Sequence, residues 1–354
     1  MSLSRIGFSL AKPLLHRLDA EQAHRLTIAG LKLGVTNASR PQDWPRLETK
    51  LFGLSFANPL GLAPGFDKNA EVPDAMLRQG FGFVEIGTVT PKPQDGNPKP
   101  RLFRLLEDEA VINRMGFNNE GHAVVRQRLE ARRKRSGEVG INIGANKDSS
   151  DRIEDYVQGI SAFSDLASYI TINISSPNTP GLRNLQGRVD LQRLLDRLNK
   201  ARKPSLPMLL KIAPDLSMDE LQDVADVCDG GTVDGVIISN TTLSRPQLRS
   251  PHATEAGGLS GKPLHQLSTQ QLALFYKLSK GRIPLIGVGG IHNAETAWDK
   301  IIAGASLIQL YSALVFQGPK LIDEICQGLD AKLTAHGFSN IGQAVGSQNG
   351  EAGR

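Results

Sequence analysis

Polar side chains that can bind and react with a small ligand follow one strand-like run of the sequence. The run Tyr169–Ile174 is rich in β-branched residues and has the length of a strand. Two prolines and a glycine come soon after it and prevent the strand from continuing. Asn173, Ser176 and Asn178 therefore gather where the strand ends. Amide groups there can bind a polar heterocycle and a hydroxyl can transfer a proton, although one such segment alone favours a polar turn.

The same pattern recurs where other expected strands end, which favours a shared ligand site over a set of unrelated turns. Lys211 stands out because an ammonium group inside a strand is costly to bury without a partner. Apolar residues on both sides of Lys211 argue against an exposed edge position. The other polar residues near expected strand ends are Asp67, Lys68, Thr88, Asn142, Ser239, Asn240 and Thr241.

The last two expected strands end in residues that suit a phosphate group. Gly289 and Gly290 follow the seventh strand, and Tyr311 and Ser312 follow the eighth. Glycines let backbone N–H groups approach a phosphate, and barrels commonly bind phosphate at this position. The expected ligand has a phosphate tail and a flat head that binds amides. FMN has both parts, and a phosphosugar fits nearly as well on these grounds.

The order of elements predicts an α/β protein with a (β/α)8 TIM barrel. Eight strand patterns alternate with eight helical patterns, whereas a doubly wound sheet usually has fewer strands. The glycines at 287–290 also lack the GxGxxG spacing of a dinucleotide-binding turn. The expected strands are Leu60–Ala63, Phe83–Val89, Gly140–Gly144, Tyr169–Ser175, Met208–Ala213, Gly235–Asn240, Leu285–Gly289 and Leu307–Tyr311. The expected helices lie near residues 70–80, 119–135, 150–166, 187–202, 217–229, 263–280, 293–303 and 318–334.

Three regions are expected along the chain. Residues 1–36 form a small N-terminal extension of two amphipathic helices, which suits a membrane surface, although periodicity alone favours packing on the main domain. Residues 46–335 form the barrel, which a hairpin over residues 47–57 precedes. The loops after the second, fourth and sixth strands are long, which predicts that the ligand site lies at the carboxyl ends of the strands. Residues 340–354 form a polar tail that we expect to be disordered.

Composition and spacing argue against several classes of function. Lys and Arg total 41 against 36 Asp and Glu, a net charge of +5, and no basic run indicates a nucleic-acid partner. No segment has the roughly 18–20 uncharged apolar residues that span a bilayer. Cys228 and Cys326 are isolated, which indicates buried thiols in a reducing compartment, and no histidine spacing indicates a metal. The paired carboxylates of a glycosidase are also missing.

Several long motifs occur in a fixed order from about residue 5 to residue 335. They are APGFDKN, EIGTVTPKPQDGNPKPRLFRL, NRMGFNN, INISSPNTPGLRNLQ, LLKIAPD, NTT, GGLSG and IGVGGI. Together they closely resemble the quinone-dependent (class 2) dihydroorotate dehydrogenases. The resemblance implies an FMN barrel that oxidises (S)-dihydroorotate to orotate in de novo pyrimidine synthesis and passes electrons to a membrane quinone. It also implies a monomeric, peripheral protein on the cytoplasmic side of the cell membrane.

The resemblance also implies roles for individual residues. Ser176 would be the base that removes the C5 proton of dihydroorotate, while C6 delivers a hydride to flavin N5. A serine hydroxyl is a weak base alone and needs a proton relay, and Thr179 and Phe117 resemble the residues along that route. Ser239 departs from the threonine that is common in the family but keeps the hydroxyl.

The binding residues follow from the same motif matches. For dihydroorotate and orotate they are Lys68, Asn113, Arg114, Met115, Gly116, Phe117, Asn173, Asn178, Asn240 and Thr241. For FMN they are Pro64, Gly65, Phe66, Asp67, Lys68, Thr88, Asn142, Asn173, Lys211, Ser239, Gly261, Gly290, Tyr311 and Ser312. For the quinone they are His24, Arg104 and Tyr311.

Other functions remain as alternatives at this point. One is a soluble, class 1-like dihydroorotate dehydrogenase, although that class lacks the N-terminal extension and carries cysteine where Ser176 stands. Another is a cofactor-free aldolase or isomerase that binds phosphate and uses Lys211 as a Schiff base. A flavin barrel that binds RNA is suggested only by the basic isoelectric point, and a non-catalytic membrane scaffold does not explain the amides at the strand ends.

Overall fold

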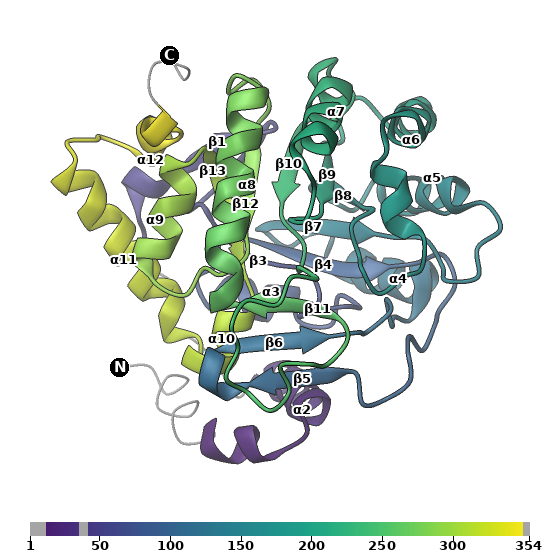
Figure 1. Ribbon diagram of the computed structural model, residues 1–354, viewed down its shortest axis with the longest axis horizontal. Helices are drawn as coiled ribbons and strands as arrows, with labels where there is room; N and C mark the ends of the chain where they lie inside the picture. The colour runs from purple at the N-terminus through teal and green to yellow at the C-terminus, as the bar shows by residue number, and fades with distance from the viewer. Residues whose placement is uncertain (1–11, 35–41, 350–354) are drawn as a thin grey trace.

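Eight parallel strands close into a barrel in the computed structural model, which describes residues 12–34 and 42–349 (Figure 1). The strands follow one another around the barrel in the order β10-β12-β13-β3-β4-β7-β8-β9. Each overlaps the strand expected from the sequence, so the (β/α)8 prediction is confirmed. Their bounds are β3 (Leu60–Leu62), β4 (Phe83–Val89), β7 (Glu138–Ile143), β8 (Ile170–Asn173), β9 (Met208–Ile212), β10 (Gly235–Ile238), β12 (Leu285–Val288) and β13 (Ala305–Leu310).

Helices alternate with the strands and surround the barrel (Figure 1). Local capping explains where several of them begin: Asp151 accepts from Glu154 N, and Ser217 and Glu220 form a capping box. All eight expected helices are present. They are α3 (Pro73–Arg78), α4 (Gly121–Arg132), α5 (Arg152–Phe163), α6 (Arg188–Ala201), α7 (Met218–Asp229), α8 (His265–Leu278), α9 (Ala294–Ile302) and α11 (Lys320–Ala335). Short elements not expected are α10 (Ser312–Gln317) and the 3-10 turns η1 (Pro45–Leu47), η2 (Leu106–Asp108), η3 (Leu182–Gln186) and η4 (Lys262–Leu264).

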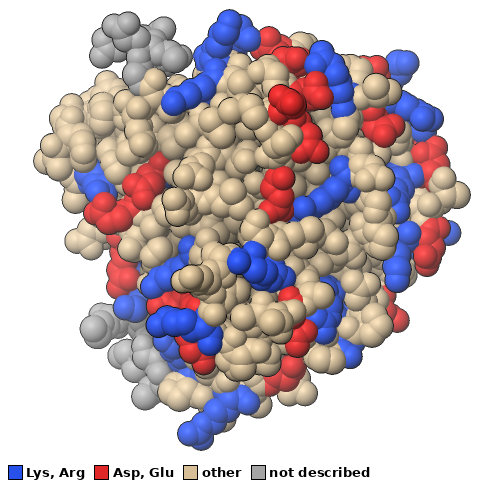
Figure 2. Space-filling view, in the orientation of Figure 1, with Lys and Arg blue, Asp and Glu red and all other residues tan. Residues whose placement is uncertain are grey.

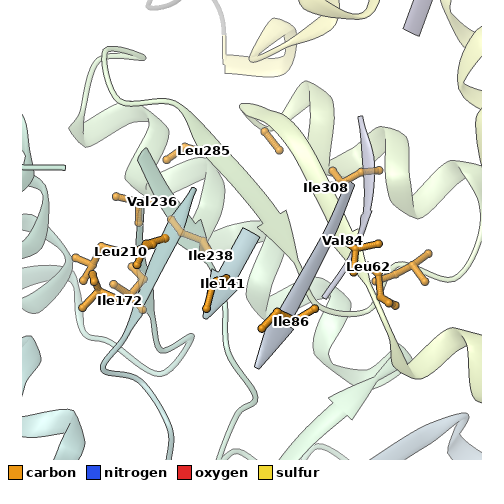
Figure 3. Close-up of a cluster of buried hydrophobic side chains, with 14 of the residues drawn as sticks. Leu62, Val84, Ile86, Ile141, Ile172, Leu210, Val236, Ile238, Leu285 and Ile308 are labelled. Carbon is orange, nitrogen blue, oxygen red and sulfur yellow. The ribbon is translucent and has the colours of Figure 1, made fainter. Parts of the chain in front are cut away.

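Alternation along the strands divides the barrel into two cores. Outward residues pack with the helices in one large cluster, of which Val84, Ile141 and Leu210 are labelled in Figure 3. Inward residues at the amino-terminal ends of the strands form a second apolar cluster with Phe56. Phe56 belongs to the expected hairpin, which pairs β1 (Thr49–Leu51) with β2 (Leu54–Phe56). The hairpin therefore closes the amino-terminal end of the barrel and leaves the carboxyl end for a site.

A three-stranded antiparallel sheet occupies two of the regions that we expected to be loops. Its strands are β5 (Leu102–Leu105), β6 (Ala110–Asn113) and β11 (Gly258–Gly261), in the order β11-β6-β5. Buried and half-buried residues alternate along β5 and β6, and the buried ones form a small apolar cluster with Leu259. Strands of four residues give too short a pattern to recognise, and β11 pairs across more than 140 residues of sequence.

The N-terminal extension packs on this sheet through helix α2 (Ala20–Lys32), which lies beside β5 (Figure 1). Asp19 caps α2 by accepting from Glu21 N and Gln22 N, each at 3.0 Å. Residues 12–17 are helical as well, whereas residues 1–11 of the first expected helix and residues 35–41 lie outside the described residues. Among the described residues, no helix has the length and apolar character to cross a bilayer.

The C-terminal segment differs from the expected disordered tail. Helix α12 (Ile341–Ala344) begins at Asn340, whose side chain accepts from Gln343 N. Ile341 and Ala344 are buried in the main core, and Asn349 Nδ2 donates to Ala303 O at 2.9 Å. The polar composition of this segment therefore gave no indication that Ile341 and Ala344 would pack in the core. The end of this segment, residues 350–354, lies outside the described residues.

Basic and acidic side chains are interspersed on the face that Figure 2 presents. Neighbouring helices contribute ion pairs to the outer surface, such as Arg197 of α6 with Glu154 of α5 at 2.6 Å. Arg188 of α6 pairs in the same way with Asp223 and Asp226 of α7, at 2.8 and 2.9 Å. Exposed pairs of this kind each contribute only about 0–1 kcal/mol to stability.

Candidate active site

One cavity of about 570 Å³ begins at the carboxyl ends of the barrel strands and continues beneath the N-terminal helices. Its barrel end is lined by Asn173, Ser176 and Lys211, and its far end by His24 and Leu31 of α2. Residues from distant parts of the chain thus share one interior space. A reaction at the strand ends and a second reaction near α2 can therefore use the same bound cofactor.

Most of the predicted site residues line this cavity. They are His24, Pro64, Gly65, Phe66, Lys68, Thr88, Arg104, Asn113, Met115, Gly116, Phe117, Asn173, Ser176, Asn178, Lys211, Ser239, Asn240, Thr241, Gly261, Gly290, Tyr311 and Ser312. Three predicted residues are not part of its wall: Asp67, Arg114 and Asn142.

The structure gives each of these three a different position. Asp67 is buried in its own turn, where it accepts from Glu71 N and Val72 N, each at 2.8 Å. The Arg114 side chain turns away from the cavity and pairs with Glu255 at 2.7 Å. Asn142 lies beneath the wall and contacts residues that line it. The sequence could not indicate the position of the Arg114 side chain, because its partner Glu255 lies 141 residues away along the chain.

An amide network fixes the side chains at the strand ends. Asn173 Nδ2 donates to Thr88 Oγ1 at 2.9 Å and to Asn142 Oδ1 at 3.0 Å. Asn240 Nδ2 donates to Ser175 Oγ at 3.0 Å and to Asn173 Oδ1 at 3.3 Å. Because these groups hold one another, the network presents a preorganised polar wall to a ligand.

Below this wall, the barrel interior contains one buried carboxylate and one buried ammonium. Glu85 accepts from Asn142 Nδ2 at 2.8 Å, from Tyr169 Oη at 3.0 Å and from Gln309 Nε2 at 2.7 Å. Side chains alternate between the two faces of a strand, and Leu210 faces outward, so the Lys211 side chain points inward. Burial lowers the pKa of Lys211, and the charge of Glu85 partly opposes this shift.

The ammonium of Lys211 makes no hydrogen bond with any described residue, although the side chain is only 6% exposed. Because Lys211 lines the cavity, a ligand there can provide the acceptor that the described residues do not. Sequence reasoning did not single out Glu85, because an acidic residue in a strand pattern gives no signal of its own.

Ser176 lies in the cavity wall and is only 5% exposed to solvent. Its Oγ accepts from Asn178 N at 3.3 Å, and within residues 12–34 and 42–349 no acidic or basic side chain hydrogen-bonds to it. Thr179 is equally buried nearby in sequence, and Phe117 has a positive φ of 54° at the cavity wall. The hydroxyl can thus accept a proton only if a relay carries it onward.

Lys68 provides a cation at the same end of the cavity. Its Nζ donates to Gly65 O at 2.7 Å. Burial lowers the pKa of Lys68 to about 8, while Glu21 opposes this shift. Across the cavity, Asn178 Nδ2 donates to Asn113 O at 3.1 Å. An ammonium and several amides suit a small ring with a carboxylate.

The backbone near the last strands is packed too closely for a side chain at two glycines that line the cavity. Gly290 has φ +75°, and a Cβ there would come within 2.4 Å of the His265 backbone. Gly261 has φ +98°, and a Cβ would come within 2.4 Å of Glu109 O. Ser260 Oγ and Ser312 Oγ lie 2.8 Å apart beside them. This is the expected place for a phosphate.

His24, Phe66 and Tyr311 form an aromatic cluster in the cavity wall. The Phe66 ring lies edge-on to His24 and to Tyr311, with centroids 5.4 and 5.5 Å apart. Tyr311 Oη lies 3.3 Å from His24 Nδ1, and burial lowers the pKa of His24 to about 3. Arg104 Nη1 donates to His16 O at 3.1 Å, but its buried Nε has no partner among the described residues.

Comparisons with known proteins agree with this geometry. A family model described as dihydroorotate dehydrogenase matches residues 46–333. The chain is 58% identical over 341 residues to "Dihydroorotate dehydrogenase (quinone)" of Parvibaculum lavamentivorans, covering 96% of this chain and 98% of the relative. It is 56% identical over 347 residues to the protein of the same name from Rhodopseudomonas palustris, covering 96% and 95%.

Solved structures give the same result for the fold and the family. A crystal structure of DHODH from Eimeria tenella in complex with ferulenol has a TM-score of 0.90 and 38% identity, covering 93% of this chain and 96% of that one. The ligand-free structure from the same organism has a TM-score of 0.89 and 39% identity, covering 94% and 100%. The chain belongs to the dihydroorotate dehydrogenase family, and within it to the quinone-dependent class 2.

Proposed function

We propose that this protein oxidises (S)-dihydroorotate to orotate with FMN as its cofactor and transfers the electrons to a quinone, in pyrimidine biosynthesis. The single observation that carries the proposal is the continuous cavity from Ser176 to His24. It gives two substrates access to one cofactor from different sides. The family membership supports the same reaction, and it leaves the class 1 and aldolase alternatives without support.

The residues of the cavity fit FMN. Lys211 has an unpartnered ammonium that suits the polar edge of the flavin ring, and Thr88, Asn173 and Ser239 add polar groups. Gly261, Gly290 and Ser312 line the cavity and suit the phosphate, because backbone N–H groups of glycines can approach it closely. Of the predicted FMN residues, Asn142 and Asp67 act from behind the wall, through Asn173 and through the turn at 67–72.

Ser176 is the proposed base of the reaction. FMN, when bound, accepts the hydride that leaves C6 of dihydroorotate. Ser176 removes the C5 proton, and because the hydroxyl is a weak base, it must pass its own proton onward along the route of Thr179 and Phe117. Burial of Ser176 excludes bulk water from this step.

The substrate is held by groups from four segments of the chain. Lys68 and the backbone at 113–117 suit the carboxylate, and Asn113, Asn173, Asn178, Asn240 and Thr241 suit the ring amides. The Arg114 side chain pairs with Glu255, so we assign its contribution to the backbone alone.

Anaerobic mixing of the purified protein with dihydroorotate tests the function directly. The visible flavin absorbance should bleach on mixing and return when a quinone is added. A colourless protein that does not react after incubation with FMN would refute the proposal.

The pKa of Lys68 predicts a pH dependence of orotate binding. Burial is the main cause that lowers this pKa to about 8, and the charge of Glu21 limits the effect. The ammonium is present below that pKa and is lost as pH rises through it, so the orotate dissociation constant should rise about tenfold between about pH 7 and 9. Flavin difference spectra measure it, and Lys68→Met should bind weakly at both pH values. An equal constant at both pH values in the unmodified protein would contradict the assignment.

Arg104 is the proposed quinone contact that can be tested most cleanly. Its buried Nε lacks a partner among the described residues, so a quinone carbonyl can accept from it. Arg104→Gln should raise the KM for quinone about tenfold and leave flavin reduction by dihydroorotate unchanged. Stopped-flow measurement of the two half-reactions separates these effects, with exposed Arg17→Gln as the control. A slowed dihydroorotate half-reaction with normal quinone kinetics would disprove the assignment.

Membrane contact through residues 1–36 completes the proposal. Leu14, Leu26 and Leu33 are 65%, 56% and 81% exposed on the extension, and basic residues lie near them. Apolar residues with basic flanks suit insertion into an anionic membrane surface. We propose that the protein works as a monomer, bound peripherally to the cytoplasmic side of the cell membrane, with residues 1–36 as the extension and 46–335 as the barrel.

A further inference from the structure

We propose that Glu21, on helix α2 of the extension, is a positioning residue for the dihydroorotate site and acts through Arg101 and Asn97. The identity of the ligand in this inference rests on the proposed function. The geometry that carries it is a series of polar contacts that begins with a buried ion pair. These contacts run from the extension to two of the loops that line the substrate end of the cavity, those after β6 and β8.

The first contact is an ion pair with two hydrogen bonds. The carboxylate of Glu21 accepts from Arg101 Nη2 at 2.9 Å and from Arg101 Nε at 3.0 Å. Glu21 is 6% exposed and Arg101 5% exposed. Two parallel charge-assisted bonds fix the guanidinium plane as well as its position. Glu21 also pairs with the more exposed Arg25 at 3.2 Å and Lys99 at 3.4 Å. Removal of Glu21 would leave the buried Arg101 guanidinium without its carboxylate.

Arg101 then orders the loop that follows β4. Its Nη1 donates to Asp95 O at 2.6 Å and to Asn97 O at 2.8 Å. Its own backbone carbonyl accepts from Arg114 N at 2.9 Å. The guanidinium that Glu21 orients thus holds the backbone of Asn97 in place.

Asn97 connects the loops after β6 and β8, which both line the substrate end. Its Nδ2 donates to Arg114 O at 3.0 Å and to Asn178 O at 3.3 Å, and its backbone N donates to Met115 O at 3.0 Å. Met115 and Asn178 line the cavity. Asn178 N in turn donates to Ser176 Oγ at 3.3 Å. The contacts that start at Glu21 therefore end at the proposed base.

The charge of Glu21 supports the same site. Glu21 raises the pKa of Lys68 against the effect of burial, whereas Arg101 lowers it. Arg101 keeps Glu21 ionised by holding its pKa at about 2. The carboxylate thus helps Lys68 to remain charged where an anionic ligand needs it.

Glu21→Gln tests the inference, because it keeps the shape of the side chain and removes its charge. In the full-length enzyme with FMN, we expect the orotate dissociation constant and the KM for dihydroorotate to rise about tenfold. The kcat at saturating dihydroorotate and the KM for quinone should each change less than about twofold. Amide hydrogen exchange without ligand should increase over residues 94–118 and 176–180.

Lys32→Gln is the matched control. It breaks another ion pair between α2 and the barrel, that of Lys32 with Glu71, and neither residue hydrogen-bonds to Asn97. Orotate affinity in this variant should equal that of the unmodified enzyme.

Two outcomes would overturn the inference. One is unchanged orotate affinity and unchanged exchange in Glu21→Gln. The other is an equal loss of affinity in Lys32→Gln, which would indicate a general loosening of α2. Failure of the unmodified enzyme to bind orotate would instead refute the proposed function. In that case the exchange measurement on Glu21→Gln still decides whether Glu21 orders the two loops.

Discussion

Replacement of Ser176 with alanine is expected to lower the turnover of dihydroorotate by about 10²–10⁴-fold while FMN remains bound. The hydroxyl is the only part of the side chain that can accept the C5 proton, and alanine removes it without adding volume. Ser176 is 5% exposed, so replacement by a bulk water molecule is restricted. Stopped-flow reduction of the flavin by dihydroorotate measures the loss, and the flavin absorbance of the purified variant measures cofactor content.

The neighbouring serine provides a control for general effects of removing a buried hydroxyl. Ser175 Oγ accepts from Asn240 Nδ2 at 3.0 Å, and Ser175 is not part of the cavity wall. Ser175→Ala should therefore alter the KM for dihydroorotate more than the rate of flavin reduction at saturation. If Ser176→Ala reduces the flavin at the unmodified rate, Ser176 is not the base.

The barrel and most of its site could be predicted because both depend on short-range patterns. Strand alternation places Lys211 and Asn173 inside the barrel once the strand is recognised. Polar residues at the carboxyl ends of parallel strands must then converge, whatever their distance in sequence. The runs of apolar and β-branched residues also indicated each barrel strand to within two residues of its limits.

The parts that could not be predicted depend on partners that are distant in sequence. Arg114 turns toward Glu255, and β6 pairs with β11 across the loop after the sixth strand. Arg101 is buried only because Glu21 of the extension reaches it. In the C-terminal segment, Asn349 Nδ2 donates to Ala303 O, 46 positions earlier in the chain. Composition and periodicity carry no information about such contacts.

Replacement of Lys211 with methionine is expected to weaken FMN binding roughly 10- to 100-fold without lowering the stability of the apoprotein. The ammonium makes no hydrogen bond with a described residue, so its removal breaks no contact within that part of the chain. Methionine fills a similar volume without an ammonium that must be desolvated, which offsets the lost attraction between Lys211 and Glu85. Glu85 keeps its three hydrogen-bond donors in the variant.

For this account to hold, the FMN affinity must fall in Lys211→Met while the stability of the apoprotein does not. Titration of apoprotein with FMN, followed by flavin fluorescence, gives the affinity, and thermal unfolding of the same sample gives stability. Lys50→Met, at an exposed position of the hairpin on the other end of the barrel, should change neither. If Lys211→Met lowers apoprotein stability and leaves FMN affinity unchanged, the lysine stabilises the barrel itself. If the ammonium instead serves the cofactor, it lowers the stability of the apoprotein. FMN binding then restores that stability, because the ligand supplies the missing acceptor.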